Sequence, residues 1–145
     1  MDAVKIKISD YLAAHRYLRL GTVTGKATPQ VHTVGYVSRD CIVFFATDRK
    51  SRKAGNISKN PAVAYAVDEN YDDIMVIQGV QMEGRASLVT LETEAMKILD
   101  LMARKFPGLE KMPANPDLVI FMIEPVRGFF LDNTVAFGHR YSVEF

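Results

Sequence analysis

Alternating apolar and polar positions predict a chain made mostly of short β-strands. Runs rich in β-branched and aromatic residues are separated by turn-forming pairs such as Gly25-Lys26 and Arg39-Asp40. The longest run is expected to bend at Gly79 and Gly84, and the last is interrupted at Pro125. The predicted strands span residues 18–24, 30–38, 41–47, 62–68, 74–89 and 118–131.

Three segments predict helices. Residues 3–16 place apolar side chains on one helical face, although the alternation over residues 4–8 suits a strand equally well. A short helix over 51–59 is capped by Ser51 and ends before Asn60-Pro61, because proline disfavours helical backbone in the residue before it. A third helix is expected to run from a Thr90 cap to Phe106. Its predicted buried stripe is Ala95, Ile98, Leu99, Met102 and Phe106.

Six strands joined mainly by tight turns indicate a mainly β (α+β) fold, a six-stranded antiparallel barrel with peripheral helices. The helix over 51–59 is too short to suggest a doubly wound parallel sheet. No linker, repeat or low-complexity block divides the 145 residues, so residues 1–145 are expected to form one domain.

Composition excludes several classes of function. A formal charge of +1 argues against a general nucleic-acid binder. The single cysteine, Cys41, excludes a disulfide framework, and His15, His32 and His139 lack metal-ligand spacing, so no metal site is predicted. Neither a nucleophile elbow nor a glycine-rich dinucleotide fingerprint occurs. With no signal or membrane-spanning run visible, we expect a soluble cytoplasmic protein without a membrane partner.

The most informative chemistry lies where the strand 41–47 leads into the helix 51–59. Four cations, Arg49, Lys50, Arg52 and Lys53, surround the cap Ser51. A helix N-terminus already carries unpaired N–H groups and the positive end of the dipole, so cations there repel it unless an anion is bound. The junction therefore predicts a phosphate site. A solvated basic loop is the alternative.

Three pieces of sequence together resemble a known family. Ser51-Arg52-Lys53-Ala54 is followed by Asn60-Pro61-Ala62-Val63, and Gly84-Arg85-Ala86 ends the long strand. Over about residues 5–131 this order resembles the pyridoxamine 5′-phosphate oxidase-like family of FMN-binding split barrels. The resemblance implies a split barrel that binds FMN at the interface of a homodimer.

The resemblance also implies which residues contact the cofactor. Arg52 and Lys53 would hold the flavin phosphate, and the second strand would run along the isoalloxazine ring and ribityl chain. Gln78 and Gln81 stand near the position of a glutamine that reaches the flavin from the partner subunit, and strand alternation puts them on opposite faces. The implied cofactor-binding residues are Val31, His32, Thr33, Val34, Ala46, Thr47, Ser51, Arg52, Lys53, Gln78 and Gln81.

The chain departs from the oxidase at three places, the first being the glutamine position, which falls near Gly79 with Gln78 and Gln81 as imperfect substitutes. Residues 31–36 lack the arginine and lysine that the oxidase carries in this strand, and the C-terminal tryptophan and arginine-rich segment has no counterpart. The resemblance therefore implies FMN binding rather than pyridoxamine-phosphate oxidation.

Several residues keep two interpretations each. His32 contacts the flavin or satisfies a local hydrogen bond, and Tyr36 stacks on the flavin or plugs the barrel. Gly35 admits a planar ring or marks a bulge. The tail 132–145 also has two interpretations. In the first, Phe137 covers the flavin and His139-Arg140 attracts an anionic substrate. In the second, the tail packs in the dimer.

These features favour an FMN-binding oxidoreductase or flavin reductase that acts on a small organic substrate or electron donor. The flavin would carry the redox chemistry, so no catalytic residue is assigned. Two alternatives remain: a non-catalytic flavin carrier or electron-transfer protein, and the same barrel holding haem or a deazaflavin. Haem would require His32 or His139 as its axial ligand.

Overall fold

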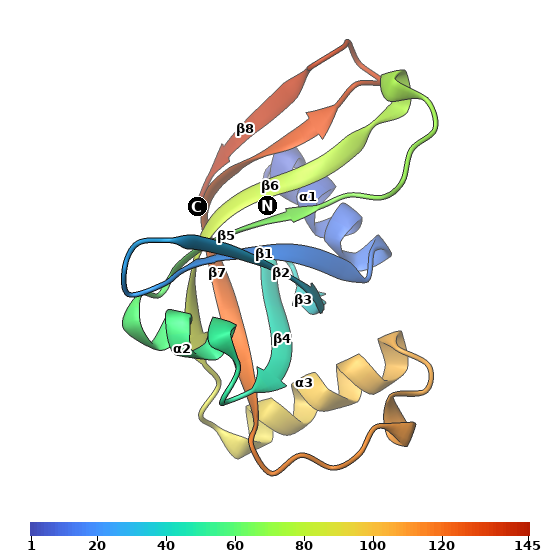
Figure 1. Ribbon diagram of the computed structural model, residues 1–145. Helices are drawn as coiled ribbons and strands as arrows, with labels where there is room; N and C mark the ends of the chain where they lie inside the picture. Colours follow the sequence, from blue (N-terminus) through green and yellow to red (C-terminus); the bar gives the residue numbers. More distant parts are fainter.

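Eight strands form one antiparallel sheet that curls into a split barrel in the computed structural model, which describes residues 1–145 (Figure 1). The hydrogen-bonded order is β2-β1-β5-β6-β7-β4-β3, and β8 pairs with β7 outside this path. The strands are β1 Tyr17–Val23, β2 Pro29–Gly35, β3 Val37–Arg39, β4 Ile42–Asp48, β5 Ala62–Val67, β6 Gln78–Leu88, β7 Leu118–Asp132 and β8 Arg140–Glu144.

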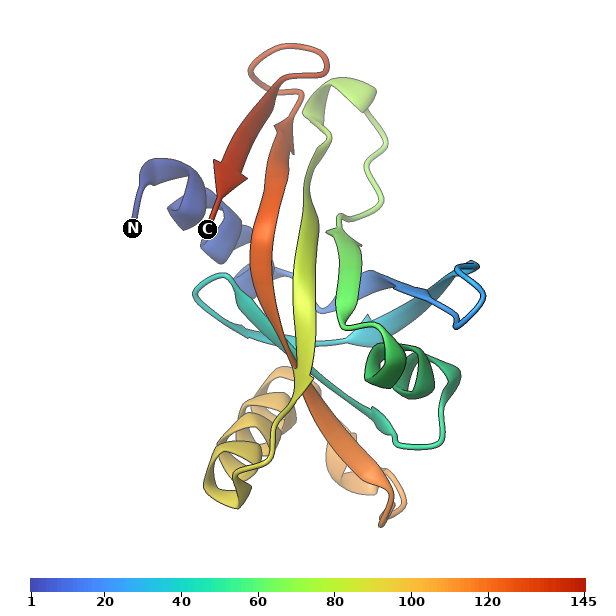
Figure 2. The same cartoon turned by 90° about the vertical axis from the view of Figure 1, so that its left-hand side faces the viewer.

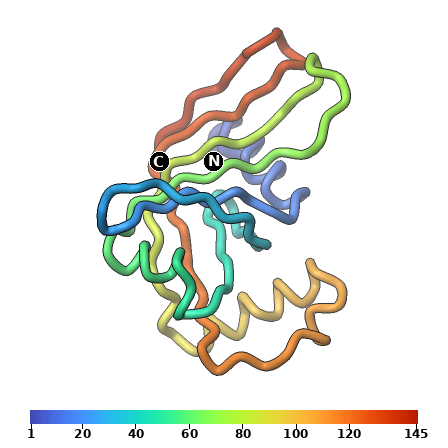
Figure 3. The backbone as a smooth tube through the Cα atoms, viewed as in Figure 1, coloured from blue at the N-terminus to red at the C-terminus, as the bar shows by residue number.

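Three α-helices surround the sheet: α1 Ala3–Ala14, α2 Arg52–Lys59 and α3 Glu92–Lys105. Two 3-10 turns, η1 Ile74–Val76 and η2 Leu109–Lys111, complete the regular structure. The β7–β8 hairpin and η1 rise at one end of the molecule and α3 lies at the other, as both views show (Figures 1 and 2). The two chain ends lie close together between them (Figure 3), where the Lys5 ammonium is 4.8 Å from the centre of the Phe145 ring.

The predicted split barrel is confirmed, but the count of six strands was wrong. The expected strand 30–38 is two strands, because β2 pairs with β1 at one edge of the sheet and β3 pairs with β4 at the other. Tyr36 lies at the break, fully buried, and its hydroxyl donates to the Leu12 carbonyl over 2.6 Å. The chain leaves one edge and joins the other because this side chain is turned into the core. The tail supplies the further strand β8.

The long strand expected over 74–89 is also shorter than predicted. Residues 74–76 form η1, and β6 begins at Gln78. The bend expected at Gly84 is real: the β6–β7 register shifts there, with Gly84 opposite Pro125. A Cβ at Gly84 would lie 2.8 Å from the Glu124 carbonyl oxygen, so the close approach of the two backbones requires glycine.

Packing of α3 against the outside of the barrel forms a second, smaller core. Ile98 and Met102 are buried there with Phe44, and Ala95 and Phe106 pack around them. The predicted stripe is correct except for Leu99, which is 38% exposed. The predicted Thr90 cap was wrong, because the cap residue is Leu91 and no side chain accepts a bond there.

Candidate functional site

The turn between β4 and α2 is built around two hydroxyl groups. Ser51 caps α2, and its Oγ accepts the Ala54 N–H over 3.3 Å. The same Oγ lies 3.2 Å from Oγ1 of Thr47, the penultimate residue of β4. The predicted cap is therefore present, and the two hydroxyls stand side by side at the N-terminus of the helix.

The four cations at this turn divide into two pairs. Arg49 and Lys50 both pair with Asp117, Lys50 over 3.1 Å. These contacts hold the pKa of the Asp117 carboxyl below its ordinary value. Arg52 and Lys53 form no ion pair. The two cations without an ion-pair partner are thus the first two residues of α2, where the helix dipole adds to their charge.

His32 of β2 extends this cluster. Its Nε2 lies 3.4 Å from Nη2 of Arg52. Because a guanidinium only donates, Nε2 is the acceptor and the neutral ring carries its proton on Nδ1, a buried atom with no hydrogen-bond partner. Burial, and then the charges of Lys53 and Arg52, lower the pKa of His32. The cluster thus presents two cations and a spare N–H donor.

Asn56 fixes the helix to the barrel. Its Nδ2 donates to Thr22 Oγ1 over 3.0 Å and to Gln30 Oε1 over 2.9 Å, which ties α2 to both β1 and β2. Sequence reasoning missed this residue. Its position four residues after Arg52, on the same helical face, was the available signal.

The predicted residues of β2 lie on both faces of an edge strand. His32 and Val34 point toward the barrel interior, whereas Val31 and Thr33 lie on the outer face. Because β2 pairs only with β1, its other edge keeps unpaired backbone N–H and C=O groups.

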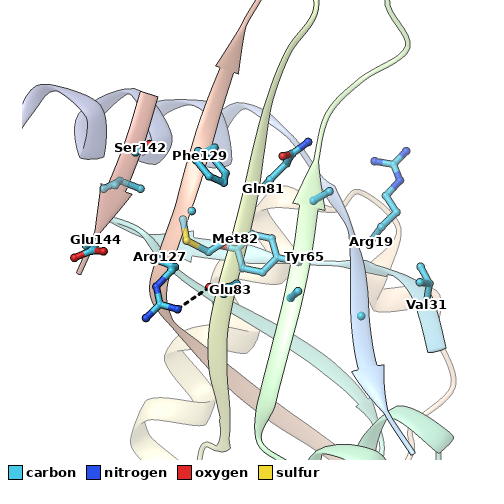
Figure 4. Close-up of a pocket in the computed structure, with 15 residues that line it drawn as sticks. Arg19, Val31, Tyr65, Gln81, Met82, Glu83, Arg127, Phe129, Ser142 and Glu144 are labelled. Atoms are coloured by element: carbon cyan, nitrogen blue, oxygen red, sulfur yellow. Dashed lines mark hydrogen bonds and ion pairs between the residues drawn. The ribbon is translucent and has the colours of Figure 1, made fainter. Parts of the chain in front are cut away.

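A groove of about 770 Å³ runs across the outer face of the sheet. Cross-strand register places Thr33, Arg19, Ala66, Gln81 and Phe129 in one row across five strands. Figure 4 shows Arg19, Gln81 and Phe129 along the groove.

Beside this row in the groove, Arg127 Nη1 donates to Glu83 Oε2 over 3.3 Å (Figure 4). Arg19, Glu83, Arg127 and Phe129 were not predicted as site residues. Their outward positions on alternating strands were the only signal.

The two candidate glutamines are separated as alternation predicted. Gln81 is exposed in the outer groove. Gln78 is half-buried on the other face, where its backbone carbonyl accepts the Tyr11 hydroxyl over 3.0 Å. Gln81 is therefore the more exposed of the two glutamines and the one that lies in the groove.

Other predicted positions serve packing. The Ala46 side chain packs against the small core beneath α3, so it does not join the Thr47 hydroxyl at the turn. Gly35 does admit a planar ring, but the ring belongs to Phe106, whose Cζ would lie 3.0 Å from a Cβ at that position. Tyr36 plugs the barrel. The structure thus brings together His32, Thr47, Ser51, Arg52 and Lys53, and leaves Ala46 and Gln78 apart from them.

The tail forms β8 and the tip of a hairpin. Phe137 at this tip is 69% exposed, and the Arg140 guanidinium lies 4.7 Å from the centre of the Phe129 ring. His139 packs edge-on against Tyr141, and its buried Nε2 has no partner.

A family model described as pyridoxamine 5′-phosphate oxidase matches residues 4–132. The chain belongs to the pyridoxamine 5′-phosphate oxidase family. The matched residues include the turn between β4 and α2. No curated protein matches the chain. None of the helices combines the length and apolar character that crossing a bilayer demands.

Solved structures of low sequence identity share the fold of this family member. The General Stress Protein 26 from Bacillus anthracis is 23% identical, with a TM-score of 0.73 over 97% of this chain and 98% of that one. The conserved hypothetical protein Rv2991 from Mycobacterium tuberculosis is 21% identical, with a TM-score of 0.80 over 100% and 93%. The haem storage protein HutZ from Vibrio cholerae is 19% identical, with a TM-score of 0.74 over 89% and 94%.

Proposed function

We propose that this protein binds FMN, with the flavin phosphate held at the N-terminus of α2. The observation that carries the proposal is the division of the four cations. Arg49 and Lys50 share Asp117 as an ion-pair partner, while Arg52 and Lys53 have no ion-pair partner beside a helix dipole of the same sign. A phosphate dianion supplies the missing charge, and Arg52 adds the planar fork that suits phosphate oxygens.

The surrounding donors fit a phosphate and a polar cofactor rim. The hydroxyls of Ser51 and Thr47 stand at the same helix end, and the buried Nδ1–H of His32 lacks an acceptor. The open edge of β2 offers backbone groups to the polar edge of a flavin ring. FMN would supply reversible one- and two-electron transfer, and the residues of this chain would bind it and fix its orientation.

We further propose a homodimer with the flavin at the subunit interface. The outer groove supports this assembly because it exposes apolar surface, including Val31, between charged side chains. Gln81 lies in that groove, in the same row as Thr33 of the strand that also carries His32. A second copy placed on this face would bring its own Gln81 near the first copy's β2.

The activity proposed is that of an oxidoreductase or flavin reductase, which exchanges electrons between FMN and a small organic substrate or electron donor. Pyridoxamine-phosphate oxidation is not proposed, because β2 lacks the two cations of the oxidase. A pure flavin carrier is separated from an enzyme by steady-state turnover. Oxidation of NAD(P)H with an added acceptor supports the enzyme, and its absence with bound FMN supports the carrier.

The cofactor proposal is tested by titrating FMN into the apoprotein and following the quenching of flavin fluorescence. The variant is Arg52→Ala with Lys53→Ala, and the matched control is Arg49→Ala with Lys50→Ala, which removes the same charge from the same turn. Loss of two charge-assisted contacts of about 1.5–3 kcal/mol each is expected to weaken FMN binding at least about 100-fold. The control should weaken it only a few-fold. Equal losses in the two variants would contradict the proposal.

Haem is a second candidate, favoured by one observation in this chain. His139 carries a buried Nε2 without a partner, His32 would offer its buried Nδ1 in the other tautomer, and HutZ, described as a haem storage protein, shares the fold. The absorption spectrum of the purified protein distinguishes flavin from haem. A Soret band that is lost in His32→Ala or His139→Ala would replace the FMN proposal with haem and identify the axial ligand.

A further inference from the structure

A second cationic cluster lies away from the phosphate site, where the end of α1, β3 and the last turn of α3 meet. A cavity of about 260 Å³ opens there, and its lining includes Ser38, Arg104 and Lys105. None of these residues belongs to the cluster at α2. The inference drawn from this cavity is independent of the proposed function.

Lys105 is held in an unusual position. Its Nζ lies 4.0 Å from the centre of the Tyr36 ring, a side chain that is fully buried. No carboxylate pairs with Lys105. Arg16 is also close, because its Nε donates to the backbone carbonyl oxygen of Lys105 over 3.4 Å. The amine therefore rests on an aromatic face, with a guanidinium nearby and no counter-ion.

The charges around the cavity do not balance. Arg104 pairs with Asp100 over 2.7 Å, one turn earlier on α3. Arg16 and Lys105 have no acidic partner, so three cations share one carboxylate. An anion that entered the cavity would meet the unpaired charge of Lys105 at its wall, with the unpaired charge of Arg16 outside the lining but close to Lys105.

The helix dipole explains only part of this arrangement. Cations in the last turn of a helix are favourable, which accounts for the presence of Arg104 and Lys105 at the end of α3. It does not account for an amine half-buried against Tyr36 at the wall of a cavity, since an extended lysine in water would satisfy the dipole equally well. Burial of such an amine next to a second cation is the setting in which lysine becomes a nucleophile.

The electrostatic consequence agrees with the geometry. Burial, and then the charge of Arg16, lower the pKa of Lys105 to about 8. About a tenth of the amine is then neutral at pH 7. The Arg16 guanidinium and the Tyr36 ring lie next to it, and burial raises the pKa of the Tyr36 phenol. The Arg104–Asp100 pair is exposed on the same helix.

We propose that Lys105 is the reactive amine of a second small-molecule site, which takes a small aldehyde that bears a carboxylate or phosphate group. Arg104, in the lining of the cavity, holds the anionic group, and Arg16 beside Lys105 adds a second positive charge. The neutral amine of Lys105 attacks the carbonyl carbon and forms a C–N bond. After proton transfer from nitrogen to oxygen the former carbonyl oxygen leaves as water, and an imine remains. No atom changes its net oxidation level, so no oxidant or reductant is required.

The test is reductive trapping with glyoxylate and cyanoborohydride on the full chain, with each lysine mapped by mass spectrometry. The internal comparison is Lys97, an exposed lysine on the same helix. Lys105 is expected to be labelled on the order of tenfold faster than Lys97 at neutral pH, with a rate that levels off above pH about 8. Lys105→Arg keeps the charge and the fold, and should remove this label alone.

Two further arms separate the anion contact from the reactivity of the amine. Glycolaldehyde is a neutral aldehyde of similar size, so Arg16→Gln should slow glyoxylate labelling more than glycolaldehyde labelling. Glycolaldehyde phosphate shows which anion the site prefers. Equal labelling of Lys105 and Lys97 would overturn the proposal that Lys105 is a reactive amine. Equal slowing of glyoxylate and glycolaldehyde by Arg16→Gln overturns the anion site.

Discussion

The guanidinium of Arg52 lies 3.4 Å from Nε2 of His32, so the first turn of α2 contacts the edge strand β2. Nothing in the spacing of these residues, which are 20 positions apart, indicates that they meet. The contact fixes the tautomer of the ring and leaves its Nδ1 proton without an acceptor. His32 of the barrel and Arg52 of the helix thus belong to one cationic cluster.

His32 is expected to make the apoprotein less stable at mildly acid pH. Its pKa is lowered in the folded state, so the unfolded chain binds its proton more readily. Stability therefore rises with pH through the window that lies at and below the ordinary histidine value of about 6.5. Denaturant unfolding at pH 7.5 and pH 5.5 measures this loss, and His32→Gln should reduce it.

Two carboxyl groups affect stability in a different range of pH. Hydrogen bonds and nearby cations lower the pKa values of Asp48 and Asp117 below the ordinary carboxyl value of 3.8. Their contribution is lost only as pH falls below that value, so it does not overlap with the effect of His32. An unchanged difference between pH 7.5 and pH 5.5 in His32→Gln would show that the histidine is not responsible.

Asn56→Ala should loosen α2 from the barrel. The change removes two hydrogen bonds and leaves the hydroxyl of Thr22, which is 1% exposed, without its donor. We expect a loss of about 1–3 kcal/mol in the free energy of unfolding, together with weaker FMN binding because the helix carries Arg52 and Lys53. Ser58→Ala is the matched control, since this exposed hydroxyl bonds only within the same helix. Similar losses in both variants would place the effect in the helix itself.

Local chemistry accounts for what the sequence predicted well. A serine cap, a proline after an asparagine and a run of β-branched residues act over a few positions, and the start of α2 was predicted for this reason. The bend at Gly84 also follows from one residue, because only glycine fits the close backbone approach there.

Contacts between distant residues account for what was missed. The division of strand 30–38 depends on Tyr36 turning inward to reach Leu12, and β8 exists only because it pairs with β7. Asp117 lies 68 residues from Arg49, so no local pattern shows which two of the four cations have an ion-pair partner. A phosphate site was predictable from the turn. Only the fold shows that Arg52 and Lys53 are the two cations without an ion-pair partner.

Gly35→Ala is expected to destabilise the protein. A Cβ there would lie 3.0 Å from Cζ of Phe106, so the ring must move or the strand must shift. Overpacking of this kind costs about 1–3 kcal/mol in the free energy of unfolding. Phe106→Leu should restore part of the loss when combined with it. Gly55→Ala is the matched control: nothing lies within 4 Å of its Cβ position in α2, and alanine should stabilise that helix by about 0.5–1 kcal/mol.

Substitutions at Ser51 separate the stability of α2 from the binding of an anion. Ser51→Ala removes the cap on the Ala54 N–H and should cost about 0.5–2 kcal/mol in the free energy of unfolding, with weaker FMN binding as well. Ser51→Asp keeps a capping oxygen and adds a negative charge that favours the helix dipole, so stability should be retained or increased. The same carboxylate repels a phosphate and neutralises Arg52 and Lys53, so FMN affinity should fall by more than tenfold. Thermal unfolding and FMN titration of the two variants measure the two effects independently. If Ser51→Asp bound FMN as tightly as the unmodified chain, the phosphate would have to lie elsewhere, because no dianion is accommodated beside a new carboxylate without loss.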